Sequence, residues 1–364
     1  MNENLSNIWQ KRPLIISGPC SAETAEQVIQ TAIQLKEIGK VDVLRAGIWK
    51  PRTRPNMFEG VGSIGLPWLL EAKKITGLPT AIEIANAKQV EEALRHEVDI
   101  LWIGARTTGN PFSVQEIADV LKGVDIPVLI KNPLHPDLEL WIGALERIQK
   151  TGIKHVGLIH RGFATYGDSD YRNPPMWHVA IEMKRLNPGI LFLNDPSHIC
   201  GRRDTLLKVA QCAIDLAYDG LMIESHLQPD LAWSDAKQQV TPSQLNTLLN
   251  SIHWRRNITE NDFIHAELDN MRLQINQLDE ALIQLLAQRM KIADNIGDFK
   301  RENNIAILQT DRWNEILERA TKQGISLGLS PEFVVNYVNA VHMESIQHQN
   351  NVMNLITNPV ELAK

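Results

Sequence analysis

The stretch Leu14-Ile15-Ile16-Ser17-Gly18-Pro19-Cys20 carries the pattern from which the architecture of this 364-residue chain can be predicted. Its run Leu14–Ser17 is short and shows no alternation of polar and apolar residues, which is typical of a strand buried on both faces. A reactive side chain, Cys20, follows shortly after the run. Similar runs recur along the chain at Val41–Leu44, Thr80–Ile84, Ile100–Ile103, Pro127–Ile130, His155–Ile159, Leu191–Leu193 and Gly220–Ile223.

Segments with helical spacing separate these runs. Examples are Glu23–Ile38, Ala87–Arg95 and Arg202–Tyr218, in which apolar residues recur three and four positions apart. Eight strand–helix units match the usual length of a (β/α)₈ barrel, about 250 residues. We therefore predict an α/β fold, with a (β/α)₈ TIM barrel over residues 1–250. An open doubly wound sheet is the alternative.

Each predicted strand is followed by a side chain capable of chemistry. In a (β/α)₈ barrel the carboxyl ends of the strands meet at one face, where the active site lies. A single arginine after a strand is more often a solvated loop residue, but a suitable group after every strand indicates a shared site. These residues are Cys20, Arg45, Glu83, Arg106, Lys131, Arg161, Asp195 with His198, and Glu224.

Composition limits the class of ligand and the compartment. The formal net charge is −6, which argues against nucleic acid as a partner. Cations at the ends of apolar runs are therefore expected to bind small anions. The three cysteines form neither a disulfide framework nor a zinc motif. No apolar run approaches the roughly 20 residues of a membrane span, and residues 1–12 lack a signal-peptide core. We predict a cytoplasmic protein that does not associate with membranes.

Short motifs at the ends of these runs occur together in one order along the chain. They are Gly18-Pro19-Cys20-Ser21, Lys50-Pro51-Arg52-Thr53, Gly104-Ala105-Arg106, His160-Arg161-Gly162 and Asp195-Pro196-Ser197-His198. This set resembles the short-barrel (type I beta) class of 3-deoxy-D-arabino-heptulosonate 7-phosphate (DAHP) synthases. The resemblance implies condensation of phosphoenolpyruvate with erythrose 4-phosphate. A barrel that joins phosphoenolpyruvate to another sugar, as in keto-deoxy-octulosonate phosphate synthesis, is the alternative, and Lys50–Thr53 argues against it.

The resemblance also implies one divalent metal per barrel. By motif position, its ligands would be Cys20, His198, Glu224 and Asp235. A thiolate, an imidazole and two carboxylates do not select strongly among manganese, iron, cobalt and zinc. The resemblance therefore predicts a metal site without identifying the metal.

The two substrates implied by the resemblance are both multiply anionic. Arginine binds such groups well because its donors are paired and fixed in geometry. The residues expected at phosphoenolpyruvate are Arg106, Lys131 and Arg161, with Arg45 and Lys50 nearby, and those at erythrose 4-phosphate are Arg52 and Thr53. Lys50, Glu83 and Lys131 are expected to be catalytic, Glu83 by handling the attacking water. Arg54 stands where the family usually has serine, which affects the detail of sugar-phosphate contact.

A long helical pattern dominates residues 265–364, after a predicted linker over residues 251–264. From His265 to Asn303 apolar residues alternate at three and four, the seam of a long helix packed on partner helices. Such a helix would be about 60 Å long, more than one small domain covers, so we predict a homodimer through this all-α domain. Arg289 occupies an apolar position of the seam, where a buried cation needs an anionic partner or ligand.

Residues 265–355 resemble the all-helical class of chorismate mutases. The matching residues are Arg272, Leu278-Asp279-Glu280, Arg289, Lys300, Arg312, Ser345 and Gln349. The resemblance implies rearrangement of chorismate to prephenate, with Arg289 and Lys300 stabilising a dianionic transition state by preorganised charge. The remaining polar residues would bind substrate, Arg272 in the site of the other protomer. Relatives commonly carry glutamate, which helps to bind the substrate hydroxyl, where this chain has Trp313.

Two further expectations concern why the domains are joined. The helical domain could instead serve only to bind a ligand or to dimerise the barrel. If it is a mutase, its product prephenate is a candidate feedback inhibitor of the barrel, which would require prephenate to favour one arrangement of the domains.

Overall fold

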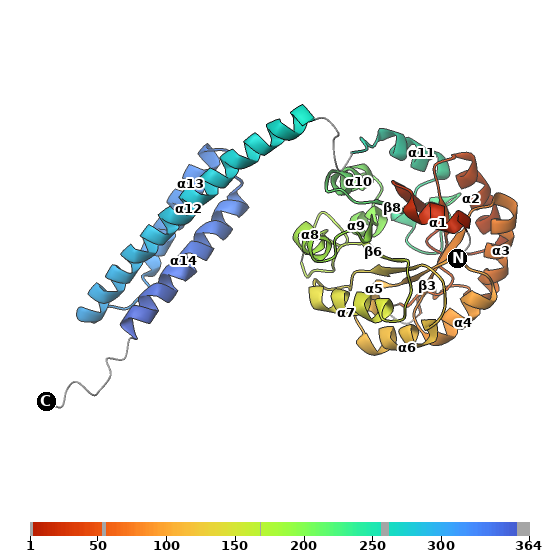
Figure 1. The fold of residues 1–364 in the computed structure, drawn as a ribbon, viewed down its shortest axis with the longest axis horizontal. Helices are drawn as coiled ribbons and strands as arrows, with labels where there is room; N and C mark the ends of the chain where they lie inside the picture. Colours follow the sequence, from red (N-terminus) through yellow and green to blue (C-terminus); the bar gives the residue numbers. More distant parts are fainter. Residues whose placement is uncertain (1–2, 53–55, 168, 256–261, 355–364) are drawn as a thin grey trace. The chain divides into compact units, whose positions relative to one another are not determined.

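A computed structural model describes residues 3–52, 56–167, 169–255 and 262–354 of the chain. The chain divides into two compact units, Met1–Asn257 and Ile258–Lys364. Figure 1 shows a ring of strands surrounded by helices in the first unit and long helices alone in the second. Within the described ranges no helix is both long and apolar enough to cross a bilayer. The boundaries predicted for the barrel, the linker and the helical domain remain predictions.

The first unit is a closed barrel of eight parallel strands in chain order, which confirms the predicted (β/α)₈ fold. The barrel closes where β1 pairs with β8, Leu14 lying opposite Gly220 and Gly18 opposite Glu224. This closure excludes the open sheet. The strands are β1 Leu14–Gly18, β2 Val43–Arg45, β3 Thr80–Ile84, β4 Ile100–Ile103, β5 Val128–Lys131, β6 Val156–His160, β7 Leu191–Asn194 and β8 Gly220–Glu224.

Helices surround the barrel and cover the outer faces of its strands (Figure 1). Several begin at a side chain that caps the first turn: Thr24, Asn86 and Asp137 each accept a hydrogen bond from a backbone N–H three residues on. The helices are α1 Glu3–Gln10, α2 Ala25–Glu37, α3 Gly65–Thr76, α4 Ala87–Arg95, α5 Ala105–Thr108, α6 Pro111–Leu121, α7 Leu138–Gln149, α8 Trp177–Leu186, α9 Pro196–Cys200, α10 Leu206–Asp215 and α11 Pro242–Ser251. Short 3₁₀ turns are η1 Gly62–Ile64, η2 Pro229–Leu231 and η3 Ala236–Gln238.

The barrel has a separate inner core that extends to α1. Leu5 and Trp9 of α1 are buried with inward-facing strand residues such as Leu14 and Trp102. Helix α1 therefore adds apolar cover to the inner core. The strand pattern did not predict this helix.

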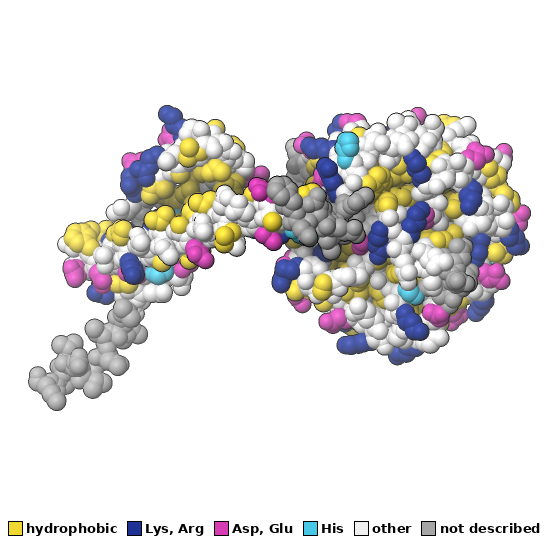
Figure 2. Space-filling view, turned by 45° about the horizontal axis from the view of Figure 1, so that its top comes forward, with side chains coloured by type: hydrophobic (Ala, Val, Ile, Leu, Met, Phe, Trp, Pro, Cys, Tyr) yellow, Lys and Arg dark blue, Asp and Glu magenta, His cyan; other side chains and the backbone are white. Residues whose placement is uncertain are grey.

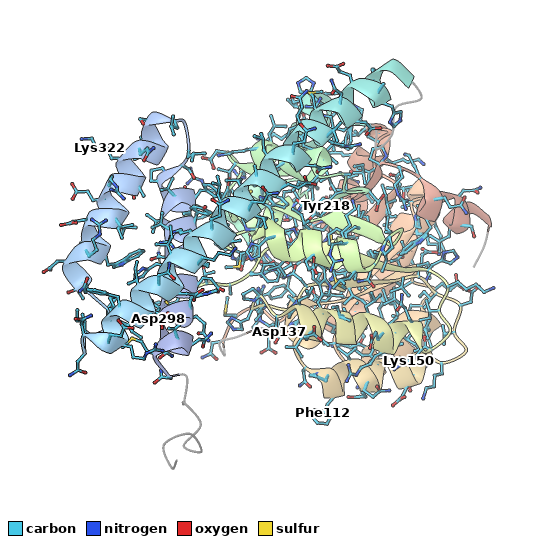
Figure 3. All side chains as sticks on the ribbon, turned by 60° about the vertical axis from the view of Figure 1, so that its left-hand side comes forward. Phe112, Asp137, Lys150, Tyr218, Asp298 and Lys322 are labelled. Carbon is cyan, nitrogen blue, oxygen red and sulfur yellow. The ribbon has the colours of Figure 1, made fainter. Side chains whose placement is uncertain are left out.

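A polar contact lies in the outer core between β6 and the helices. His160 at the end of β6 donates from Nε2 to the carbonyl of Pro175 at 2.6 Å. It accepts at Nδ1, at 2.9 Å, from the hydroxyl of Tyr218, a residue labelled in Figure 3. Burial lowers the pKa of His160 to about 4, so the imidazole is neutral near pH 7. One ring nitrogen of the neutral imidazole can therefore donate a hydrogen bond while the other accepts one.

The second unit consists, over its described residues, of α12 Asp262–Glu302, α13 Thr310–Ser326 and α14 Pro331–Met353. Small residues let the helices approach closely: a Cβ at Gly297 of α12 would lie 3.0 Å from Cα of Gln349 on α14. Only the second half of α12 is covered, since every side chain from Ile264 to Leu285 is exposed. The predicted long helix is therefore present, with an apolar first half left without cover in the single chain.

Candidate active sites

The carboxyl ends of the strands bring several predicted side chains to one rim. Arg45 and Glu224 are the last residues of β2 and β8, while Cys20 and Arg161 follow shortly after β1 and β6. A Cβ at Gly18 would lie 2.0 Å from the carbonyl oxygen of Arg45, so glycine is needed for this close approach of β1 to β2. Arg45 then donates from Nη2 to the carbonyl of Cys20 at 3.1 Å. The Gly-Pro-Cys motif thus places Cys20 at the rim.

Cys20 is fully buried among polar groups. Its Sγ lies 3.2 Å from Oδ2 of Asp235 and accepts a hydrogen bond from Nζ of Lys50 at 3.0 Å. Its backbone N–H donates to the side-chain oxygen of Gln239 at 2.8 Å. Burial, and then the negative charge of Glu224, raises the pKa of the Cys20 thiol to about 12. Without a metal the thiol therefore keeps its proton, and Asp235 can accept a hydrogen bond from it.

His198 and Glu224 form a second close pair. Nε2 of His198 lies 3.7 Å from Oε1 of Glu224, which also accepts from Nη1 of Arg45 at 3.2 Å. Nδ1 of His198 lies 2.7 Å from Oδ2 of Asp195 but is not aligned for a hydrogen bond. Burial lowers the pKa of His198 despite the nearby carboxylates. The imidazole is therefore neutral near pH 7, the form in which histidine binds metals.

The four predicted metal ligands lie as two adjacent pairs, Cys20 with Asp235 and His198 with Glu224. Among the residues that the structure describes, no group of three or more histidine, cysteine, aspartate and glutamate side chains is arranged to hold a metal ion. Cations contact these donors instead, as Arg172 does with Asp235 at 2.8 Å. The thiol, imidazole and carboxylates suit a first-row divalent cation chemically, and the assignment of a metal to them stays a prediction.

A cluster of buried cations lies beside these pairs. Nζ of Lys131 donates to Oδ2 of Asp195 at 2.8 Å, and both side chains are buried. Nη1 of Arg161 donates to Oδ1 of Asn173 at 2.9 Å. Burial lowers the pKa of Arg161 to about 10, so the guanidinium remains charged near pH 7. Nζ of Lys131 also lies 5.7 Å from the centroid of the Trp102 ring, within cation–π range.

Trp102 contacts both Glu83, a predicted catalytic residue, and the guanidinium of Arg45. Its Nε1 donates to Oε2 of Glu83 at 3.1 Å, and Cζ of Arg45 lies 4.9 Å from its ring centroid. A Cβ at Gly104 would lie 2.0 Å from Oε1 of Glu83, so the glycine leaves room for the carboxylate. Burial lowers the pKa of Arg106, while the negative charge of Glu83 opposes the shift. Glu83 therefore acts electrostatically on Arg106.

The predicted sugar-phosphate motif lies only partly within the described residues. Arg52 donates from Nε to the carbonyl of Phe58 at 2.8 Å, and its Nη1 lies 3.8 Å from Oδ2 of Asp235. Arg52 is thus within reach of the Cys20–Asp235 pair. Thr53 and the unusual Arg54 fall outside the described residues.

Arg172 was not among the predicted site residues, and Asp195 was predicted only as one of the groups at the strand ends, without a role. Arg172 donates to Asp235 and, at 2.8 Å, to Oε1 of Gln238. Burial is the largest single influence on the pKa of Asp235 and would raise it, but the charge and hydrogen bond of Arg172, together with the other neighbouring groups, outweigh burial and lower the pKa. Arg172 lies in a loop without a local signal. Asp195 has one, because an aspartate before proline often caps a helix, and it does cap α9 by accepting from the N–H of His198 at 3.1 Å.

A cavity of about 350 Å³ lies among α12, α13 and α14 of the helical unit. The side chains that line it come from predicted and unpredicted positions alike. They include Arg289, Ile292, Ile296, Lys300, Ile307, Gln309, Arg312, Trp313, Ile316, His342, Ser345 and Gln349. This set joins three cations to several uncharged hydrogen-bonding groups.

Four predicted residues meet directly across α12 and α14. Arg289 donates a hydrogen bond to Oγ of Ser345. Nζ of Lys300 donates to Oε1 of Gln349 at 3.0 Å and to the carbonyl of Ile307 at 2.6 Å. Burial lowers the pKa of Lys300. Arg289 therefore contacts a side chain of α14 and does not simply extend into solvent.

The other two predicted arginines differ in position. Arg312 lines the cavity and contacts Glu315 at 2.9 Å. Arg272 contacts Asp269 at 2.9 Å, is largely exposed, and does not line this cavity. It lies 17 residues before Arg289 on α12, about 26 Å along the helix axis.

An aromatic pair that the sequence did not predict also borders the cavity. The rings of Trp313 on α13 and His342 on α14 are stacked, with centroids 3.9 Å apart and planes inclined by 14°. Both side chains line the cavity. No local pattern could indicate this pair, because its members lie on different helices.

Comparison with known proteins assigns each unit to a family. Residues 6–260 match the DAHP synthetase I family, and residues 271–350 match chorismate mutase type II. Phospho-2-dehydro-3-deoxyheptonate aldolase of Thermotoga maritima is 34% identical over 226 residues, which cover 62% of this chain and 64% of that relative. This chain thus spans less than two thirds of that relative's length.

A solved structure and a second relative agree with these matches. A crystal structure of the Thermotoga maritima DAHP synthase aligns with a TM-score of 0.59 at 31% identity, covering 66% of this chain and 68% of that chain. A bifunctional chorismate mutase/prephenate dehydratase of Buchnera aphidicola is 30% identical over 92 residues, 25% of this chain and 24% of that relative. This chain belongs to the DAHP synthetase I family, and it carries a chorismate mutase type II domain after its barrel.

Proposed function

We propose that the barrel condenses phosphoenolpyruvate with erythrose 4-phosphate to DAHP and phosphate, and that the helical unit rearranges chorismate to prephenate. One observation carries the barrel assignment. Oδ2 of Asp195 contacts both Lys131 and His198, so a buried cation cluster adjoins a set of metal-binding groups. Anion binding and metal chemistry can therefore act on one bound pair of substrates.

Lys131, Arg161 and Arg106 are the proposed site for phosphoenolpyruvate. Lys131 and Arg161 are buried and charged, and a phosphate or carboxylate would find paired donors in a poorly hydrated environment. The same cations hold the enol in place while its methylene carbon forms the new bond to the sugar aldehyde. Arg52 is the proposed contact of the sugar phosphate, together with Thr53.

Cys20, His198, Glu224 and Asp235 are the proposed ligands of one divalent metal, with manganese, iron, cobalt and zinc all compatible. When bound, the metal would supply Lewis-acid polarisation of the aldehyde. The Cys20 thiol must lose its proton for this, and the ammonium of Lys50, 3.0 Å from Sγ, stabilises the resulting thiolate.

Glu83 is the proposed group that handles the water of the second step. That water adds to the phosphate-bearing carbon, after which phosphate leaves. The carboxylate is held at the rim by Nε1 of Trp102 and has space because position 104 is glycine. Lys50 and Lys131 complete the proposed catalytic set.

The barrel assignment is tested by phosphoenolpyruvate consumption in purified full-length protein. Erythrose 4-phosphate or arabinose 5-phosphate is supplied, each with and without a chelator. We expect turnover with the four-carbon sugar that the chelator abolishes and added divalent metal restores. Turnover with arabinose 5-phosphate alone would support the octulosonate-type reaction, and no turnover after metal is restored would reject both.

The mutase assignment rests on the charged cavity of the helical unit. Arg289, Lys300 and Arg312 border a space of about 350 Å³, and a compact dianion would be stabilised there by fixed positive charge. Ser345 and Gln349 contribute uncharged hydrogen bonds. Replacing Arg289 with alanine should lower the rate of chorismate consumption by roughly 100-fold or more, the usual effect of removing one preorganised group that stabilises transition-state charge. An unchanged rate would leave the helical unit with only a binding or dimerising role.

We also propose that the helical unit forms a homodimer through the first half of α12. Exposed apolar side chains are frequent there, among them Leu273, Leu278 and Ile283, and Figure 2 shows hydrophobic side chains over the surface of this unit. A second α12 would bury them, and it would bring the partner's copy of Arg272 within reach of the cavity. Sedimentation of the purified chain tests the dimer.

The role of Arg272 can be tested by mixing two inactive variants, R272A and R289A, after co-refolding. A random mixture gives half heterodimers, each with one complete site if Arg272 acts across the interface. About a quarter of wild-type mutase activity should therefore return. No recovery would place Arg272 in the site of its own chain, and R272A that is active by itself would place Arg272 outside the site.

Prephenate is the proposed feedback inhibitor of the barrel. The covalent joining of the two units supports this proposal, since a ligand of the helical cavity could then bias the arrangement of the chain. Synthase kinetics with saturating prephenate test it, with R289A as the control that cannot bind the effector well. Unchanged kinetics in the wild type would reject feedback by prephenate.

A further inference from the structure

His342 of α14 has a polar atom without a partner at the border of the helical cavity. Its Nε2 atom is buried and makes no hydrogen bond. Within the described part of the helical unit it is the sole buried side-chain nitrogen or oxygen in this condition. Ser345 and Gln349, by contrast, already contact Arg289 and Lys300. Because an unpaired buried polar group is costly, His342 is expected to gain a partner when the cavity is occupied.

The charge state of His342 indicates which kind of partner suits it. Burial, followed by the positive charges of Arg289 and Lys300, lowers its pKa below the ordinary 6.5. A neutral imidazole has one donor and one acceptor nitrogen. The cations of the cavity match the negative charges of a dianion, whereas a neutral imidazole matches an uncharged oxygen that can both donate and accept, such as a hydroxyl.

Trp313 fixes the orientation of this imidazole. The ring centroids lie 3.9 Å apart and the planes are nearly parallel. The stacked indole therefore keeps the imidazole from turning out of this plane. Trp313 has no hydrogen-bonding side-chain acceptor of its own. Its stacked ring provides a flat surface against which His342 is held.

We propose that His342 hydrogen-bonds the hydroxyl group of the cyclohexadienyl dianion bound in the helical cavity, and that Trp313 is the residue that positions it. This assignment rests on the proposed mutase function. It adds a contact to the uncharged hydroxyl of the ligand. The cations alone cannot distinguish this ligand from a deoxygenated dianion of the same size. His342 thereby becomes a determinant of substrate specificity.

The test compares H342L and H342Q in the full-length protein. H342L keeps apolar volume but cannot hydrogen-bond, and kcat/KM for chorismate should fall roughly 3- to 10-fold, the effect of one neutral hydrogen bond. H342Q restores a donor and an acceptor and should recover most of the loss. W313L leaves His342 in place but removes the ring on which it stacks. It should lower kcat/KM for chorismate by a factor similar to that of H342L. Circular dichroism of each variant confirms folding.

A second measurement separates ligand recognition from a merely structural role. Binding of prephenate, which has the hydroxyl, is compared with binding of a deoxygenated analogue of the same charge. H342L should weaken the binding of prephenate roughly 3- to 10-fold and leave the binding of the analogue unchanged. Equal weakening of both ligands, or of neither, would overturn the proposal.

The outcome for the proposed mutase function is read independently from R289A. If the wild type converts chorismate and R289A does not, while H342L behaves as wild type, the mutase assignment holds and the role of His342 is rejected. If the wild type neither converts chorismate nor binds prephenate, the mutase assignment is rejected, and the role of His342 is rejected with it.

Discussion

Replacing Asp195 with asparagine tests whether one buried carboxylate organises the rim of the barrel. Oδ2 of Asp195 lies 2.8 Å from Nζ of Lys131 and 2.7 Å from Nδ1 of His198, while Oδ1 caps α9. Asparagine keeps an oxygen for the cap and removes the charge. Lys131 would then be left buried without its carboxylate partner.

The size of the effect follows from this geometry. At 2.8 Å and an effective dielectric constant of about 20, the attraction between the two charges is about 6 kcal/mol. Part of it offsets the cost of removing both ions from water, and breaking a buried pair by removing one partner typically costs about 3–5 kcal/mol. For a unit of this size we expect the midpoint of thermal unfolding to fall by about 6–20 °C.

The assay is thermal unfolding of D195N followed by far-ultraviolet circular dichroism, with phosphoenolpyruvate binding measured on the same preparation. The matched control is D204N, which removes a carboxylate from the exposed pair with Arg202. Such a pair contributes about 0–1 kcal/mol, so the control should unfold within a few degrees of the wild type. If D195N is no less stable than D204N, the rim does not depend on the Lys131–Asp195 pair.

Three further predictions concern Gly104, His160 and Trp9. In G104A the new Cβ would lie 2.0 Å from Oε1 of Glu83, so the Glu83 carboxylate must move away from Trp102. We therefore expect kcat for phosphoenolpyruvate consumption to fall at least tenfold, with little change in overall stability. His160 is neutral when folded, with a pKa of about 4 against the ordinary 6.5. Below pH 6.5 the unfolded chain therefore binds the proton more readily, and stability should fall by about 3 kcal/mol as pH drops toward 4, a slope that H160F should lack in acid denaturation. W9A removes a buried side chain of the inner core and should cost about 3–5 kcal/mol in thermal or denaturant unfolding.

The barrel was predictable because its strands are buried on both faces and therefore read as continuous apolar runs. All eight predicted runs overlap a strand of the structure. Thr80–Ile84 and Ile100–Ile103 coincide with their strands, and the other six differ by one or two residues at an end, as at Val41–Leu44 against β2 Val43–Arg45. Strand ends are hard to place because the last residue of a run is decided by pairing with a neighbour. Helix α1 was not predicted, since its apolar residues follow no strand pattern and are buried only against the inner core.

The site was predictable where chemistry follows a strand end and not where a loop folds back. Arg45, Lys131 and Glu224 end strands, so their common face follows from the barrel itself. Arg172 reaches Asp235 from a loop with no periodic pattern. In the helical unit the heptad seam located Arg289, but a seam describes one helix only, and it could not indicate the stacking of Trp313 on His342.

The sequence by itself determined the two architectures and indicated the families to which they belong, because hydrophobic period and the order of reactive residues are properties of the chain. Only the tertiary structure decided which polar groups meet: that the Cys20 thiol lies between Lys50 and Asp235, and that Arg289 contacts Ser345. Contact distances and burial set pKa values and hydrogen bonds, and both depend on residues far apart in the chain. The physical reason is that electrostatic interactions fall off with distance in space, which position along the sequence does not specify.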